Sequence, residues 1–472
     1  MSAGDIFLLS ASIFVTVLAG WIVLYLITGR EIFAEIPFAE RISLAYLFGI
    51  GAITFEMFLL SFFNIGYMRS NILIPWVFPV ALASARMLRR GNRGKEDTSP
   101  RALSRYRRQE AMRGPDILLA ILIAMQVFYN FFRAIIKPIE SYDAVAIYGL
   151  KAKIIYLAGG ISGNFFQNLS GFFQGSHPDY PLFVPLSETW IYTFLGRFDD
   201  MFVKILFPLL YLAFLTVFYS VLKRITGTRR LALLFTFILA TIKQFSDYAT
   251  IGLSDLPLGI YFALGIMYIY LWMSEKEKTY FLKISALSLA LCTWTKNEGV
   301  LLAFFGLVAL LAYAVRNKPD VNTRSIFIYA AFVLAFIAAW RMFIFKQGIV
   351  NENFNVSMLG SGNFMSGLGK LPLIAYEFQK HIFGFKKWNI FWVLLLLVFF
   401  NGLRYAFSGN TKYITYILIM FLFGYTLVYM FSAVEIDFFL RKTWSRFLLH
   451  ILPLAVFWTA LMLYSVKKTE KA

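Results

Sequence analysis

Five short polar motifs interrupt an otherwise apolar sequence, and each carries side chains that could do chemistry. In chain order they are ESYDA, HPDYP, LSDLP, TKNEG and WSRFLLH. Carboxylates in such motifs can take a proton from a hydroxyl, whereas lysine, arginine and histidine can hold a phosphate or another anion. The set favours acid–base chemistry on an anionic substrate, provided that the fold brings the motifs together.

The first motif supplies two candidate general bases, Asp143 and its acidic neighbour Glu140. Pro138 ends the preceding apolar run and turns the chain, because proline cannot continue a helix. Asp143 then heads an amphipathic stretch, 144–157, where partial shielding from water suits a proton acceptor. The alternative is that Glu140 or Asp143 only caps the helix that follows, since acidic residues are favoured at that position.

Three further candidates, His177, Asp179 and Tyr180, lie in HPDYP, where two prolines stiffen the chain. They could bind a sugar hydroxyl, a phosphate or a metal, or they could form only the turn before a helix. Asp255 of LSDLP precedes a proline, as in an ordinary helix start. It becomes a pocket residue only if it faces the same side as Asp143.

The last two motifs supply the candidate cations. Lys296 and Glu298 interrupt an apolar stretch, where a charge at bilayer depth costs at least ~2.5–3.5 kcal/mol, so such residues are usually paired or functional. Arg446 and His450 are four residues apart and share one helix face. All three basic side chains could bind a phosphate, although Lys296 could instead pair with Glu298. The alternatives are a hairpin tip at the interface for Lys296 and snorkelling to lipid headgroups for Arg446.

The elements that must position these residues are membrane-spanning helices. The 472 residues are 59% hydrophobic and 15% charged, whereas soluble domains are about 45–50% apolar and about 25% charged. Apolar runs long enough to cross a bilayer predict about thirteen spans in an all-α polytopic membrane protein. The runs lie at 6–27, 42–63, 72–88, 116–136, 201–222, 231–245, 256–273, 282–294, 300–315, 326–345, 390–406, 413–431 and 447–466.

Basic loops predict how these spans are oriented. Ten lysines and arginines lie in segment 86–113, and such clusters stay on the cytoplasmic side. Further basic clusters at 223–230, 276–283, 316–324, 404–412 and 467–471 then fall on the same side. The five polar motifs fall on the opposite, outer side. This arrangement requires 282–315 to be a hairpin, because one helix of that length would measure about 50 Å.

Two long outer loops, 137–200 and 346–388, complete the layout. The first should contain interfacial helices at 144–157 and 181–196, and the second should be mobile between 351 and 370. The net charge of +19 is explained by span ends and anionic lipid rather than by nucleic acid. A single cysteine, Cys292, excludes an intrachain disulfide and a cysteine metal cluster.

In the order and sidedness of these motifs, the chain resembles the GT-C superfamily of integral-membrane glycosyltransferases, in particular the protein-mannosyltransferase and aminoarabinose-transferase groups. Asp143 matches their acidic residue in the first outer loop, and His177–Pro181, Asp255–Pro257 and Lys296–Gly299 are similar to their later motifs. The resemblance covers roughly 112–315. The acidic motif departs from a tight pair, because Glu140 stands apart from Asp143.

The resemblance implies a core at 115–345, preceded by an added three-span segment at 1–114 and followed by C-terminal spans at 346–472. It also implies transfer of a sugar from a polyprenyl-phosphate donor to an acceptor hydroxyl on the non-cytoplasmic face of the plasma (inner) membrane. The acceptor is a lipid-linked, polysaccharide or protein hydroxyl.

Within that scheme Asp143 acts as base, and Lys296, Arg446 and His450 hold the donor phosphate. His177, Asp179, Tyr180, Asp255 and Glu298 line the sugar or acceptor pocket. No cofactor follows from the motifs, and the need for a divalent metal stays open. Two other functions stay open as well: a lipid-linked glycan ligase, and a transporter or flippase of an anionic lipid-linked solute.

Overall fold

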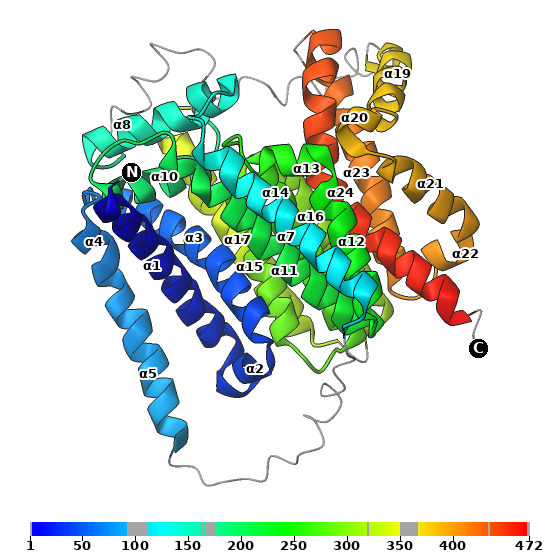
Figure 1. The fold of residues 1–472 in the computed structure, drawn as a ribbon, viewed down its shortest axis with the longest axis horizontal. Helices are drawn as coiled ribbons and strands as arrows, with labels where there is room; N and C mark the ends of the chain where they lie inside the picture. Colours follow the sequence, from blue (N-terminus) through cyan, green and yellow to red (C-terminus); the bar gives the residue numbers. More distant parts are fainter. Residues whose placement is uncertain are drawn as a thin grey trace.

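Helices make up most of the described structure, and the longest of them are apolar (Figure 1). This computed structural model describes residues 2–91, 112–161, 165, 176–318, 321–349, 367–432 and 435–469. Within these ranges, ten helices are long and apolar enough to cross a membrane. They are Ala3–Thr28, Phe38–Phe62, Arg69–Leu88, Gly114–Ile135, Phe202–Thr226, Asp255–Ser274, Glu298–Arg316, Thr323–Lys346, Thr411–Met430 and Ile436–Val466. The chain is therefore an all-α, multi-pass integral membrane protein.

Three of the expected spans are shorter than a bilayer crossing. Run 231–245 is divided into α12 (Arg229–Thr241) and α13 (Lys243–Tyr248), because Ile242 between them has an extended backbone. Run 390–406 is divided at Gly402 into α21 (Phe391–Asn401) and α22 (Leu403–Ala406). Run 282–294 is α15 (Tyr280–Thr295), with 16 residues. The expected count of about thirteen spans is thus not confirmed.

Among the ten candidate spans, the helix most enclosed by protein is α14 (Asp255–Ser274), which is 94% buried over its apolar stretch. It packs against α11 (Leu206–Thr226), α15, α16 (Glu298–Arg316) and the long last helix, α24 (Ile436–Thr469). α23 (Thr411–Met430) packs against α16 and α24, and α17 (Thr323–Lys346) packs against α15. The start of α14 is consequently surrounded by several helix ends.

The expected hairpin at 282–315 is confirmed. α15 ends at Thr295, Lys296 has an extended backbone, and α16 begins at Glu298. The two helices pack so closely that a Cβ on Gly299 would lie 2.1 Å from the carbonyl oxygen of Cys292. This sharp break places Lys296, Asn297 and Glu298 together at one end of the bundle.

The segment between α7 (Gly114–Ile135) and α11 contains the two expected helices, but one of them is not on the surface. A turn of π-helix (η2, Ala144–Gly149) continues into α8 (Leu150–Ala158). The second helix, α10 (Phe183–Leu195), is buried along its whole length and packs against α1 (Ala3–Thr28), α3 (Phe38–Phe62) and α8. It belongs to the core, so the expectation of an interfacial helix at 181–196 is wrong.

The remaining helices lie at the edges of the bundle. α4 (Arg69–Leu73) and α5 (Val77–Gly91) stand at one side, joined to α1 through α2 (Arg30–Glu35) and α3. α19 (Leu371–Ile382) and α20 (Phe385–Trp388) lie near the first turns of α24 at the upper right of Figure 1. Most of the segment expected to be mobile, 351–370, and most of the basic segment 86–113 fall outside the described residues.

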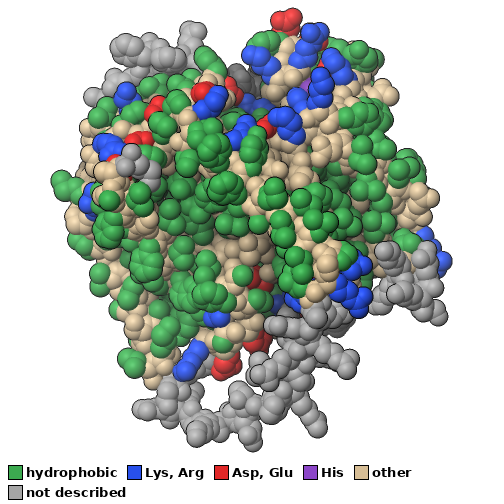
Figure 2. Space-filling view, in the orientation of Figure 1, with side chains coloured by type: hydrophobic (Ala, Val, Ile, Leu, Met, Phe, Trp, Pro, Cys, Tyr) green, Lys and Arg blue, Asp and Glu red, His purple; other side chains and the backbone are tan. Residues whose placement is uncertain are grey.

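Side-chain types follow the same layout. Figure 2 shows apolar side chains across the middle of the molecule, with most charged side chains gathered toward its upper and lower ends. This is the distribution that a bilayer imposes, since charges are excluded from its hydrocarbon layer. Asp143 follows the upper end of α7, whereas the basic segment 86–113 precedes its lower end.

One close helix crossing joins α1 to α3 within the N-terminal part of the chain. A Cβ on Gly20 of α1 would lie 1.7 Å from the Ala45 carbonyl oxygen of α3, and one on Gly49 would lie 1.8 Å from the Thr16 carbonyl oxygen. Small residues that let backbones touch are typical of membrane-helix interfaces. Trp190 of α10 donates a hydrogen bond to the Thr16 hydroxyl (3.0 Å), which ties α10 to this crossing.

A methyl group at this crossing should therefore destabilise the protein. We expect Gly49→Ala to lower the free energy of unfolding by at least ~1–3 kcal/mol, the usual effect of overpacking, because the contacted atom is backbone and cannot rotate away. Gly114→Ala is the control, since nothing lies within 4 Å of a Cβ built there. Thermal unfolding of the purified protein in detergent measures both. Equal melting temperatures for the two variants would contradict the close crossing.

Candidate functional site

A buried carboxylate, Asp255, is the centre of a charged cluster at the upper end of the bundle. It lies in the first turn of α14, where the helix dipole favours a negative charge, and its side chain is 0% exposed. Lys296 Nζ lies 3.1 Å from Oδ1, and His450 Nε2 lies 2.8 Å from the same oxygen. A carboxylate in such a place is stable only when cations and hydrogen bonds replace its water.

Arg446 joins this buried acid to Asp143. Its Nε and Nη2 donate to Asp255 Oδ2 at 3.2 and 2.9 Å, and its Nη1 donates to Asp143 Oδ2. Arg446 lies on α24, whereas Asp143 directly precedes η2, so one guanidinium connects segments 303 residues apart. The Asp143 side chain is 31% exposed, so it forms the water-accessible edge of the cluster.

The break between α15 and α16 supplies the second cation. Lys296 bridges Asp255 and Glu298, with its Nζ 2.8 Å from Glu298 Oε1. Both lysine and arginine therefore already have carboxylate partners. A phosphate entering the cluster would meet compensated cations. Of these pairs, the sequence indicated only that of Lys296 with Glu298, which is confirmed.

The HPDYP loop lies against the same break. The Asn297 amide donates to Asp179 Oδ2 at 2.7 Å, and the Trp340 indole of α17 donates to the Asp179 carbonyl oxygen at 3.1 Å. The rings of His177 and Tyr180 stack with centroids 4.7 Å apart. His177 has a φ of +46°, in the left-handed region that few non-glycine residues adopt. The loop is thus held in one shape by contacts with its neighbours.

Lys151 of α8 is a fully buried amine in contact with this loop. It donates to the His177 carbonyl oxygen at 2.6 Å and lies 6.0 Å from the centre of the Tyr180 ring. Burial lowers the pKa of Lys151 to about 7, opposed by the nearby Asp179 carboxyl. Burial also raises the pKa of Asp179 and lowers that of His177. The pKa values of Lys151 and Asp179 therefore lie nearer to neutrality than in water, whereas that of His177 moves away from it.

Most of the residues predicted from the sequence come together here. Those in direct contact with one another, or joined through Asn297, are Asp143, Asp179, Asp255, Lys296, Glu298, Arg446 and His450. Tyr180 is adjacent, with Lys296 Nζ 5.8 Å from its ring centre, and His177 stacks on it. Asp143 pairs with Arg446 rather than only capping a helix, and Arg446 binds carboxylates rather than lipid headgroups.

Two predicted residues have different surroundings from those expected. Glu140 pairs with Lys137 (3.3 Å) and its side chain is 58% exposed, so it lies outside the cluster. His450 is fully buried: Nε2 bonds Asp255 and Nδ1 lies 3.2 Å from the Tyr425 hydroxyl. Because both ring nitrogens are engaged, His450 supports Asp255 here rather than facing a phosphate.

The sequence analysis missed three contributors to the cluster: Tyr148, Ser254 and Lys151. The Tyr148 hydroxyl lies 2.5 Å from the Ser254 hydroxyl, next to Asp255. A weak signal existed for each: Lys151 is a charge within an amphipathic stretch, Ser254 belongs to LSDLP, and Tyr148 follows Asp143 in the same helical segment. None of these signals specifies a contact across the fold.

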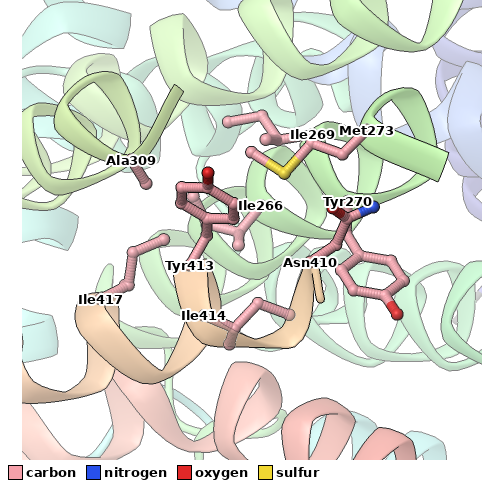
Figure 3. Close-up of a pocket in the computed structure, with 9 residues that line it drawn as sticks. All are labelled: Ile266, Ile269, Tyr270, Met273, Ala309, Asn410, Tyr413, Ile414 and Ile417. Carbon is pink, nitrogen blue, oxygen red and sulfur yellow. The ribbon is translucent and has the colours of Figure 1, made fainter. Parts of the chain in front are cut away.

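Two hollows lie away from the cluster. Figure 3 shows one of about 10 Å³, room for about one water, between α14, α16 and α23; its lining includes Ile266, Tyr270 and Tyr413. It begins 11 residues along α14 from Asp255, or about 16 Å. The other, about 420 Å³, has a lining of apolar residues of α7 together with Leu212 of α11. It lies on the helix that leads to Asp143.

A metal site is not evident in the described part of the chain. No group of three or more His, Cys, Asp or Glu side chains there is arranged to hold a metal ion. The carboxylates of the cluster are instead bound by arginine and lysine.

Comparison with known proteins gives no match: neither a family model, nor a curated protein, nor a solved structure is similar to this chain. Class and function must therefore be argued from the geometry of the cluster.

The buried Lys151 amine should make stability depend on pH. The unfolded chain keeps a lysine protonated up to about pH 10, whereas in the folded protein burial lowers the pKa of Lys151 to about 7. Between these values the unfolded state binds more protons, so the free energy of unfolding rises with pH. We expect Lys151→Met to reduce the rise in melting temperature between pH 7 and pH 9.5.

The control for this measurement is Lys153→Met, on the exposed side of the same helix. It should keep the wild-type dependence of melting temperature on pH. If the melting temperature of Lys151→Met rises with pH as steeply as that of the wild type, Lys151 does not titrate in this range.

Proposed function

We propose that the protein is a glycosyltransferase of the GT-C type, which moves a sugar from a polyprenyl-phosphate donor to an acceptor hydroxyl. One observation carries the proposal: Arg446 joins a water-accessible carboxylate, Asp143, to a buried group of charges at one end of a membrane-spanning bundle. A proton acceptor thus lies beside cations, which is what transfer from a sugar phosphate requires.

The proposed reaction uses these groups in a single displacement. The acceptor oxygen forms a bond to the anomeric carbon while the bond from that carbon to the donor phosphate oxygen breaks. The acceptor proton passes to Asp143, and the departing polyprenyl phosphate keeps the bonding electrons. Arg446 and Lys296 stabilise the charge that develops on the phosphate. Asp179 and Tyr180, held by Asn297 and Lys151, border the place for the sugar or acceptor.

The sidedness of the chain supports a non-cytoplasmic site. Asp143 lies beyond one end of α7, and the ten basic residues of 86–113 precede its other end. Since basic loops stay in the cytoplasm, the cluster belongs to the outer face of the plasma (inner) membrane. A donor dissolved in the bilayer reaches such a site from the side, and an apolar hollow lies along α7, the helix that precedes Asp143.

Removing the proposed base should abolish transfer without unfolding the protein. We expect Asp143→Asn to lower the rate of sugar transfer by about 10²–10⁴-fold, the usual contribution of a general base. The assay supplies the purified protein with a panel of polyprenyl-phosphate sugars and reads the product by mass spectrometry. Melting temperature and gel-filtration profile check that the variant is folded.

The matched control is Asp437→Asn, which breaks another Asp–Arg pair near the start of α24, with Arg441 at 2.8 Å. Its transfer rate should equal that of the wild type. Full activity of Asp143→Asn would reject the base, and a product carrying a whole glycan rather than one sugar would favour a ligase.

A further inference from the structure

Asp143 is the most exposed carboxylate of the cluster, with 31% of its side chain exposed against 21% for Glu298 and 0% for Asp255. Asp255 receives bonds from Lys296, His450 and Arg446, and none of its side chain is exposed. Among the described residues, Asp143 is hydrogen-bonded only by the Nη1 group of Arg446, and 31% of its side chain meets solvent. Water can therefore hydrate Asp143 when it leaves Arg446, whereas release of Asp255 would leave a buried charge without partners.

The two cations that hold Asp255 are already matched by carboxylates when an anion arrives. Arg446 and Lys296 face three carboxylates, those of Asp143, Asp255 and Glu298. A phosphate that arrives without displacing one of them would add negative charge to a site that is already compensated. Exchange with the most exposed carboxylate, which water can hydrate once it is released, avoids that repulsion.

The Nη1 edge of Arg446 suits such an exchange. A guanidinium binds carboxylate and phosphate oxygens with the same planar geometry. Its other edge, Nε with Nη2, is held on Asp255, which fixes the direction in which Nη1 points. The Asp143 carboxylate thus occupies the position that a phosphate oxygen would take.

We propose that this edge of Arg446 is a phosphate-binding site which Asp143 occupies until the phosphate displaces it. No covalent bond changes in this step: one ion pair replaces another, and the released carboxylate is hydrated. The identity of the phosphate as that of a polyprenyl donor, and the use of the released Asp143 as base, rest on the proposed function. On that basis Asp143 becomes a free proton acceptor only after the donor has bound, so donor binding precedes activation of the acceptor.

The test is a binding measurement that needs no transfer. Farnesyl phosphate, a short polyprenyl phosphate, is titrated against the full-length protein in detergent, with farnesol and inorganic phosphate as separate probes. We expect Asp143→Asn to bind farnesyl phosphate more tightly than the wild type, by about three- to tenfold, because the competing charge has been removed. Most substitutions in a binding site weaken binding, so the direction alone is informative.

Two further variants make the measurement specific. Asp437→Asn frees Arg441, an exposed arginine on the same helix, and should leave affinity for farnesyl phosphate within about twofold of the wild type. Arg446→Lys keeps a positive charge beside Asp255 but removes the Nη1 group, so it should weaken the binding of farnesyl phosphate. Unchanged or weaker binding by Asp143→Asn, or equal tightening by Asp437→Asn, would overturn the exchange.

The probes and the transfer assay separate the possible failures. If Asp143→Asn also binds inorganic phosphate more tightly than the wild type does, the effect belongs to the phosphate group. If only farnesyl phosphate is bound more tightly, the site takes a lipid-borne phosphate. Tighter binding of farnesol would overturn the proposal. Tighter binding with transfer intact would support the exchange but reject Asp143 as base. Unchanged binding with transfer lost would reject the exchange and leave the proposed function standing.

Discussion

The ion pairs of Asp255 are the constraint on which the rest of the site depends. A charged carboxylate without water is unfavourable by several kcal/mol unless cations and hydrogen bonds surround it. Here Arg446, Lys296 and His450 supply them from α24 and from the break between α15 and α16. The buried acid therefore fixes how these helix ends stand relative to α14, and through Arg446 it also fixes where Asp143 lies.

Much of the layout could be predicted because bilayers impose strong rules on sequence. Apolar length located most spans, and the clustering of basic loops on one side required the hairpin that separates α15 from α16. Breaks within apolar runs were harder to foresee. Nothing in the sequence around Ile242 marks the extended residue between α12 and α13, and α10 is enclosed by α1, α3 and α8, so its burial is a property of the assembled bundle.

The candidate site could likewise be predicted where it depends on local sequence, but not where it depends on contacts between distant segments. Order and sidedness were enough to expect that separate polar motifs would gather at one end. They could not show that Asp255, in what reads as an ordinary helix start, is the shared partner of the cations. Nor could they show that Arg446 would reach both Asp255 and Asp143, which are 191 and 303 residues away. Such pairings depend on tertiary contacts, as does the attachment of Asp179 to Asn297 and Trp340.

The position of Arg446 on the last helix has a consequence for biogenesis. During translation Asp255 and Lys296 enter the membrane well before the ribosome has made Arg446, so the nascent bundle holds Asp255 without its arginine. Insertion of α24 supplies that partner and closes the cluster in one late step. A chain interrupted before this helix keeps an under-compensated acid among apolar helices, a defect that membrane proteases and chaperones can recognise.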